Sequence, residues 1–197
     1  MIYLDNAAST AVHPEVVNEM LPYFDVQYGN PSSIHQFGRK AKNAIQKARK
    51  QVAVLVGAEP DEITFTSGGT ESNNTILYGG FKANTLRGLV IGKNHIITSA
   101  IEHEAILQPC QRIAQNGFKV TYLPVDEHGS IDPNDITDSI TEDTVLVSIM
   151  FANNEVGTIQ PIKEISEICK KYQIPLHTDA VQAVGKIPIN VKELGID

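Results

Sequence analysis

Short apolar runs rich in β-branched residues alternate with longer amphipathic stretches along most of the chain. The apolar runs predict buried strands. The amphipathic stretches predict helices of about ten or more residues, because their apolar positions recur at helical spacing. Alternation of this kind is typical of βαβ units. It predicts an α/β fold with a mostly parallel sheet and helices on both faces.

The predicted strands are short and are bounded by turn residues; they cover residues 63–66, 94–99, 119–123, 144–151 and 175–178. The predicted helices have periodic apolar positions and cover residues 37–56, 71–84, 103–116, 133–140 and 162–172, with another beginning near Pro14. Gly57 and Gly117 are expected to end two of these helices. Residues 2–4 are interpreted as a strand or arm.

The first sixty-odd residues are dominated by helix, before the strand–helix alternation begins. We expect an N-terminal arm at residues 1–15 and a large domain at residues 16–197. The chain has 197 residues, which is enough for one domain of ordinary size with its own core. No internal repeat or low-complexity segment interrupts it.

Composition and charge narrow the function classes. Hydrophobic residues make up 42% and charged residues 20% of the chain, values typical of a globular protein. The formal net charge of −7 argues against a nucleic-acid-binding surface. No segment approaches the ~20 apolar residues of a membrane span, and no signal peptide is evident. The expectation is a cytoplasmic protein without membrane or nucleic-acid partners.

The cysteines, Cys110 and Cys169, do not have the spacing of metal ligands. Each falls within a predicted helix, which favours buried and unreactive thiols. The sequence therefore predicts no metal site and no catalytic cysteine.

A glycine turn lies between a predicted strand and a predicted helix, at Ser67-Gly68-Gly69-Thr70. Backbone N–H groups and the positive end of the helix dipole would meet there, which favours binding of an anion such as phosphate. The same four residues are equally compatible with an ordinary capped strand–helix turn. They match neither a P-loop nor a dinucleotide-binding fingerprint.

Polar residues also follow the other predicted strands. Ligands of parallel sheets bind beyond the carboxyl ends of the strands, so these groups are expected to meet in one crevice. Besides the glycine turn, they are Glu102-His103-Glu104, Asn153-Asn154-Glu155, and Asp179 with Gln182.

This combination suits a phosphorylated aromatic cofactor, pyridoxal 5′-phosphate (PLP). The glycine turn would take the phosphate, and the imidazole of His103 could stack on the ring. The carboxylate of Asp179 would stabilise a protonated ring nitrogen, because an opposite charge within hydrogen-bond reach favours the charged form. Asn154 and Gln182 could donate hydrogen bonds to the ring hydroxylate.

Each residue also has a purely structural interpretation. His103 could be an ordinary residue at the start of a helix, and Asp179 could cap the helix that follows. The stretch Asn153–Gly157 could be only a turn. His177 is interpreted as a packed core histidine.

Several motifs together resemble cysteine desulfurases of the NifS/IscS type. The resemblance runs in order over essentially the whole chain. The motifs are Tyr3-Leu-Asp-Asn-Ala-Ala-Ser9, Gly29-Asn-Pro-Ser-Ser33, Thr66-Ser-Gly-Gly-Thr-Glu-Ser-Asn73, Glu102-His103, Asn153-Asn-Glu-Val-Gly157 and His177-Thr-Asp-Ala-Val-Gln-Ala-Val-Gly-Lys186.

The resemblance implies a PLP-dependent enzyme of fold type I, usually a homodimer. Gly69 and Thr70 would bind the phosphate, and Asp179 would pair with the ring nitrogen. Asn154 and Gln182 would contact the ring oxygen. His103, the catalytic residue implied here, would stack on the ring and help to shuttle protons.

The reaction implied by the resemblance takes sulfur from L-cysteine and releases alanine. A lysine holds PLP as a Schiff base, and a mobile cysteine thiolate attacks the substrate sulfur. The resulting persulfide is delivered to a sulfur-acceptor protein, for iron–sulfur cluster assembly or tRNA thiolation. Selenocysteine lyase shares much of this frame and is the alternative enzyme.

The sequence departs from the family pattern at its carboxyl end. The Ser-x-His-Lys stretch that carries the family's lysine does not occur in residues 1–197, and Lys186 follows Asp179 too closely to replace it. The small C-terminal domain, with its arginine and nucleophilic cysteine, is also expected to be absent. We expect this chain alone to be inactive. It could be a piece of a longer enzyme, half of a split enzyme completed by a C-terminal chain, or a non-catalytic scaffold.

Overall fold

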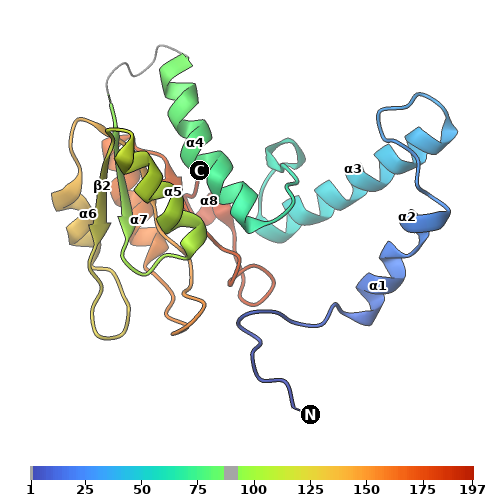
Figure 1. Ribbon diagram of the computed structural model, residues 1–197, viewed down its shortest axis with the longest axis horizontal. Helices are drawn as coiled ribbons and strands as arrows, with labels where there is room; N and C mark the ends of the chain where they lie inside the picture. The colour runs from blue at the N-terminus through green and yellow to red at the C-terminus, as the bar shows by residue number, and fades with distance from the viewer. Residues whose placement is uncertain (1, 87–92) are drawn as a thin grey trace. The chain divides into compact units, whose positions relative to one another are not determined.

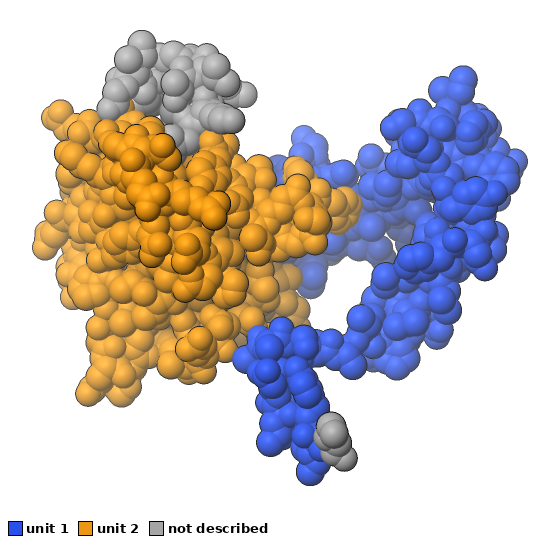
Figure 2. Space-filling model, in the orientation of Figure 1, with its two compact units in different colours: residues 1–63 blue, residues 64–197 orange. Residues whose placement is uncertain are grey.

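Parallel strands form the centre of residues 64–197. The computed structural model describes residues 2–86 and 93–197 (Figure 1). Two compact units divide the chain, residues 1–63 and residues 64–197, which Figure 2 shows in blue and orange.

The sheet of the second unit has the order β2-β1-β3-β4, and all of its pairings are parallel. The predicted α/β fold with a parallel sheet is therefore confirmed. The four strands are β1 (His95–Ser99), β2 (Lys119–Leu123), β3 (Thr144–Ser148) and β4 (Leu176–His177). All five residues of β1 are buried, as expected for a central strand with both faces covered.

Helices cover both faces of this sheet (Figure 1). Successive side chains of a strand point to opposite faces. Accordingly, Ile96 belongs to an apolar cluster with Ile106, and Ile97 belongs to a separate cluster with Ile136 and Ile165. The first cluster joins the sheet to α4 (Gly69–Leu86) and α5 (Glu104–Gln115); the second joins it to α6 (Pro133–Ser139), α7 (Ile162–Tyr172) and α8 (Val191–Leu194).

The chain leaves β1 and β3 in opposite directions. From β1 it passes through α5 to the neighbouring strand β2, and from β3 it passes through α7, on the other face, to β4. A sheet in which two adjacent strands diverge in this way has a crevice beyond their carboxyl ends. The topology therefore places a crevice at the ends of β1 and β3.

Some predicted boundaries were wrong. Residues 63–66 do not form a strand, because strand formation depends on a neighbouring strand as well as on β-branched residues, and no described strand pairs with them. The strand β3 ends at Ser148 instead of Phe151. The apolar run nevertheless continues beside β4, with the amide of Ile149 donating to the His177 oxygen at 3.1 Å. Helix α4 begins at Gly69, two residues earlier than predicted, and α8 was not predicted.

The first unit contains α1 (Pro14–Met20), α2 (Pro22–Asp25), α3 (Gln36–Val56) and the short 3₁₀ helix η1 (Pro60–Glu62). Gly57 ends α3 with a left-handed backbone at φ 72°, as predicted. Residues 2–4 do not form a strand. The proposed boundary between residues 15 and 16 stays a prediction. In the described residues, no helix is both long enough and apolar enough to cross a membrane.

The core packing of the second unit leads to a stability prediction. Ile97 is fully buried, so Ile97→Ala should lower the free energy of unfolding by about 2–5 kcal/mol through lost burial and a residual cavity. Val156→Ala is the matched control, because Val156 is 67% exposed and should change stability by less than about 0.5 kcal/mol. Urea unfolding followed by circular dichroism measures both. Equal effects of the two substitutions would contradict this description of the core.

Candidate functional site

A pocket of about 180 Å³ lies at the carboxyl ends of the strands, within the second unit. It brings together all six residues that the sequence predicted to form a cofactor site, namely Gly69, Thr70, His103, Asn154, Asp179 and Gln182. Asn73, Met150 and Val181 also line it. The expected convergence of these loops is therefore observed. The binding roles of the individual residues stay predictions.

The glycine turn forms the start of α4. The first N–H groups of a helix have no partner within the helix, and here they belong to Gly69 and its neighbours. The backbone amide of Ser67 is occupied, because it donates to Glu71 Oε2 at 2.6 Å. A Cβ atom at Gly69 would lie 2.9 Å from Val181 Cγ2, so a side chain at this position would require Val181 to move. The arrangement leaves the helix N-terminus open to an anion.

Asp179 is held by two hydrogen bonds. Its Oδ2 accepts from Asn73 Nδ2 at 2.7 Å, and its Oδ1 accepts from the amide of Val181 at 3.0 Å. The second bond closes a turn over residues 181–183, and no described helix begins there, so the structural interpretation of Asp179 as a helix cap was wrong. Asn73 was not predicted as a site residue, although it lies three positions after Thr70 and thus on the same helix face.

His103 is the N-cap of α5 and is exposed at the pocket. Its Nδ1 accepts a hydrogen bond from the amide of Ala105 at 3.1 Å. The structural interpretation of His103 is therefore correct, and it is compatible with a site role. Because Nδ1 acts as an acceptor, a neutral ring carries its proton on Nε2, which is the nitrogen left for other contacts.

Asn154 lies in a tight hairpin turn between Ala152 and Ile159, which form an isolated antiparallel bridge. Asn153, immediately before it, accepts from the amides of Glu155 at 2.8 Å and Val156 at 2.9 Å. The predicted turn and the predicted pocket wall are thus the same segment.

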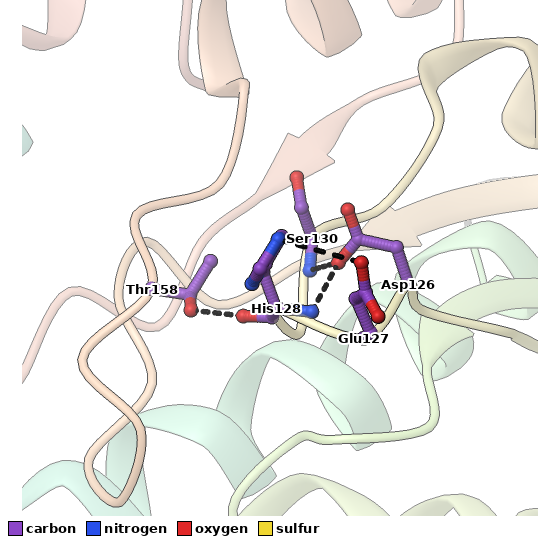
Figure 3. A network of polar contacts seen from close by, with 5 residues as sticks. All are labelled: Asp126, Glu127, His128, Ser130 and Thr158. Carbon is purple, nitrogen blue, oxygen red and sulfur yellow. Dashed lines mark hydrogen bonds and ion pairs between the residues drawn. The ribbon is translucent and has the colours of Figure 1, made fainter.

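A second loop is hydrogen-bonded to the returning arm of this hairpin (Figure 3). Thr158 donates from Oγ1 to the backbone oxygen of His128, and Gln160 donates from Nε2 to the oxygen of Gly129 at 2.7 Å. Asp126 shapes the supporting loop, since its Oδ1 accepts from the amides of His128 at 2.9 Å and Ser130 at 2.8 Å. These bonds hold the hairpin in place from outside the pocket.

Gln182 is oriented by a lysine. Lys186 Nζ donates to Gln182 Oε1 at 2.7 Å, which leaves the amide hydrogens on Nε2 for other partners. A donor at this place suits an anionic oxygen on a ligand.

Glu102 is a buried carboxylic acid behind the pocket, only 5% exposed. Burial raises its pKa to about 7, and the Asp179 charge adds to that rise. Hydrogen bonds from Ser99 Oγ at 2.7 Å and the Met150 amide at 2.8 Å, both to Oε1, oppose it. The other oxygen, Oε2, is buried and has no hydrogen-bond partner among the described residues. A proton on Oε2 would avoid an uncompensated buried charge.

Three further titratable groups, His177, Cys110 and Cys169, are unsuited to nucleophilic or proton-transfer chemistry at neutral pH. Burial lowers the pKa of His177 to about 4, and its Nδ1 shares a 2.8 Å hydrogen bond with Ser148 Oγ, as expected of a packed histidine. Burial raises the pKa of both Cys110 and Cys169 to about 12. Both thiols are buried and free, as predicted.

A larger cavity of about 620 Å³ lies elsewhere in the second unit, along α4 and β4. Its lining is mostly aliphatic and includes Leu77, Ile96, Leu146 and Leu176. The smaller pocket is the better candidate, because charged, amide and imidazole groups converge in it. In the described part of the chain, no group of three His, Cys, Asp or Glu side chains is arranged to hold a metal ion.

The sequence profile of the aminotransferase class-V family matches residues 2–197. The chain belongs to the aminotransferase class-V family. Among curated proteins, it is 53% identical to cysteine desulfurase IscS of Dictyoglomus turgidum and 55% identical to that of Methanosarcina thermophila, each over 196 residues. Both alignments cover 100% of the chain, but 48% and 47% of these relatives.

Solved structures show the same similarity. A NifS-like protein superposes with a TM-score of 0.93 at 44% identity, covering 100% of this chain and 53% of its own. A structure described as SspA in complex with cysteine gives 0.92 at 41% identity, covering 99% of this chain and 55% of its own. The resemblance to cysteine desulfurases of the NifS/IscS type is therefore confirmed. The chain spans about half the length of the relatives it matches.

The titration of Glu102 leads to a pH-dependent prediction. Its pKa is raised from 4.5 to about 7 on folding, so the stability it contributes is present below pH 4.5 and is lost as the pH rises through about 7. The pKa of His177 falls from 6.5 to about 4, so its contribution is lost as the pH falls through that range. The stability contributions of Glu102 and His177 therefore change in opposite directions as the pH rises. Glu102→Gln removes the first contribution and leaves the second.

As the pH rises from about 4.5 to about 8, the free energy of unfolding of Glu102→Gln should increase relative to that of the wild type by up to roughly 3 kcal/mol. Any difference between the two proteins that does not depend on pH adds a constant to this change. Chemical unfolding at several pH values measures the difference. Glu104→Gln is the control, because Glu104 is exposed and bonds only to the Gln108 side chain at 2.9 Å among the described contacts. A pH-independent difference for Glu102→Gln would show that Glu102 does not titrate as described.

Proposed function

We propose that this chain forms the cofactor-binding part of a PLP-dependent cysteine desulfurase. The observation that carries the proposal is the pocket at the ends of the strands. In that pocket a helix N-terminus, a carboxylate fixed by two hydrogen bonds, two amide side chains and an imidazole converge. Family membership supports the cofactor, since class-V aminotransferases and cysteine desulfurases use PLP.

The residues fit PLP at both ends. The open N-terminus of α4, with the Thr70 hydroxyl, suits the phosphate, and the missing Cβ at Gly69 leaves the backbone accessible. Asp179 suits a protonated ring nitrogen, because Asn73 and the Val181 amide already fix its carboxylate. When bound, PLP supplies an electron sink for bond cleavage next to the substrate amine.

The remaining polar groups would orient the ring and handle protons. Asn154 and Gln182 would donate to the ring oxygen, with Lys186 holding the Gln182 amide in the donating orientation. His103 would stack on the ring and exchange protons through Nε2, because its Nδ1 accepts from the Ala105 amide. This proton exchange is the catalytic role we propose for His103.

The proposed substrate is L-cysteine, with sulfur passed as a persulfide to an acceptor protein for iron–sulfur clusters or tRNA thiolation. A similar protein, SspA, has been solved in complex with cysteine, which supports this substrate class. Cys110 and Cys169 are poor candidates for the attacking thiolate, because both are buried and have raised pKa values. The nucleophile, the Schiff-base lysine and a homodimeric or complementary partner would lie outside these 197 residues. The cytoplasmic location stays a prediction.

The first test is binding of PLP. The chain should bind PLP, and Asp179→Ala should weaken binding by about tenfold or more, because the ring nitrogen loses its counter-charge. Absorbance titration and equilibrium dialysis measure the affinity. Asp138→Ala is the control, since Asp138 is exposed and outside the pocket. Equal affinity of the Asp179 and Asp138 variants would contradict the assignment.

The second test concerns turnover. Residues 1–197 alone should bind PLP without a borohydride-fixed lysine adduct and should release no alanine from L-cysteine, because the lysine segment that the family uses is not among them. Amino-acid analysis after incubation measures alanine. Multiple turnovers by the purified chain would contradict this prediction. Failure to bind PLP at all would favour a non-catalytic scaffold.

A further inference from the structure

Two buried polar side chains lie immediately before two of the pocket residues. Glu102 precedes His103 and is 5% exposed, and Asn153 precedes Asn154 and is 9% exposed. Neither is among the residues that line the pocket. Burial of polar groups is unfavourable unless they are hydrogen-bonded, so their contacts indicate what they do.

Their contacts are reciprocal. Glu102 lies on the loop that follows β1, and its Oε1 accepts from the amide of Met150, on the loop that follows β3, at 2.8 Å. Asn153 lies on the loop that follows β3, and its Nδ2 donates to the backbone oxygen of Ile101, on the loop that follows β1, at 2.9 Å. Each side chain therefore bonds to the backbone of the other residue's loop.

Each side chain also fixes its own loop. Ser99 Oγ donates to Glu102 Oε1 at 2.7 Å, and Asn153 Oδ1 accepts from the amides of Glu155 and Val156. The paired part of the two strands ends at Thr98 and Ser148, so sheet pairing does not hold these loops together. The hydrogen bonds of Glu102 and Asn153 therefore connect the two loops beyond the last paired residues of β1 and β3.

We propose that Glu102 and Asn153 are reciprocal positioning residues that set the separation of His103 and Asn154 across the pocket. The inference rests on the proposed function for the identity of the ligand, PLP. The hydrogen bonds from the Met150 amide to Glu102 and from Asn153 to the Ile101 oxygen, here called the brace, do not depend on the proposed function. Site residues held in this way need little rearrangement when a ligand binds.

Of the two residues that form the brace, Glu102 is titratable. The titratable group that acts on Glu102 in the described structure is Asp179, after β4, and the charge of Glu102 in turn raises the pKa of Cys110, on α5. Since burial raises the pKa of Glu102 to about 7, the acceptor of the Met150 amide changes charge near neutral pH. A charged acceptor strengthens the hydrogen bond. The Met150 amide proton should therefore shift with pH, with a midpoint near 7.

The first experiment examines the brace without a ligand. Amide hydrogen exchange at Met150, followed by NMR, should be faster by about tenfold or more in Glu102→Ala than in the control Glu104→Gln. If Glu102→Ala does not fold, Glu102→Gln replaces it, and the pH-dependent shift of the Met150 amide should disappear. Unchanged exchange in a folded Glu102→Ala, or a shift that persists in Glu102→Gln, would overturn the brace.

The second experiment examines positioning. Asn153→Asp keeps the oxygen that accepts from Glu155 and Val156 but loses the donor to Ile101, and it should weaken PLP binding by about tenfold. The control is Asn116→Asp, which removes a comparable donor to the Arg112 oxygen on an exposed surface. Glu102→Gln should restore most of the affinity lost in Glu102→Ala.

The two experiments separate the possible failures. If the wild-type chain binds no PLP, the proposed function fails, and the Met150 measurements still decide whether the brace exists. If exchange at Met150 changes but PLP affinity does not, the side chains stabilise the loops without positioning the site, and the proposal is overturned. Weakened binding together with faster local exchange supports it.

Discussion

The parallel pairing of β1 with β3 is the constraint on which the rest of the second unit depends. The two strands lie side by side at the centre of the sheet, and their connections run in opposite directions on opposite faces. Their carboxyl ends therefore remain uncovered by a direct crossover. The pocket residues lie on loops that this pairing brings together, or at the nearby ends of α4, α5 and β4.

Beyond the pairing, hydrogen bonds between polar side chains hold the site residues in place. Asn73 fixes Asp179, Lys186 orients Gln182, and Gln160 supports the hairpin that carries Asn154. Each of these contacts joins segments distant in sequence or aims one side chain into the pocket. Such contacts reduce the rearrangement required for ligand binding, because the groups already occupy their places.

The sequence predicted the fold well where local pattern determines structure. The strand at residues 119–123 and the helix at residues 162–172 were predicted with their observed boundaries, because periodicity and turn residues agree there. The strand at residues 63–66 was predicted wrongly, because β-branched composition does not supply a pairing partner. The convergence of the six site residues followed from the rule for parallel sheets, and the structure shows it.

The supporting residues could not be predicted in the same way. Asn73 and Asp179 are 106 positions apart, and the bond between them depends on how α4 packs near β4. Glu102 and Asn153 are adjacent to predicted site residues, but their cross-loop partners are backbone atoms, which no sequence pattern identifies. Hydrogen bonds between distant segments become visible only once the fold is known.

The most direct measurement is a titration of the chain with PLP, followed residue by residue in ¹H–¹⁵N spectra. The largest shifts should occur around the smaller pocket, at the amides of Gly69, Thr70, His103, Asn154 and Val181. Shifts centred instead on Leu77, Leu176 and Ile196, which line the larger apolar cavity, would contradict it.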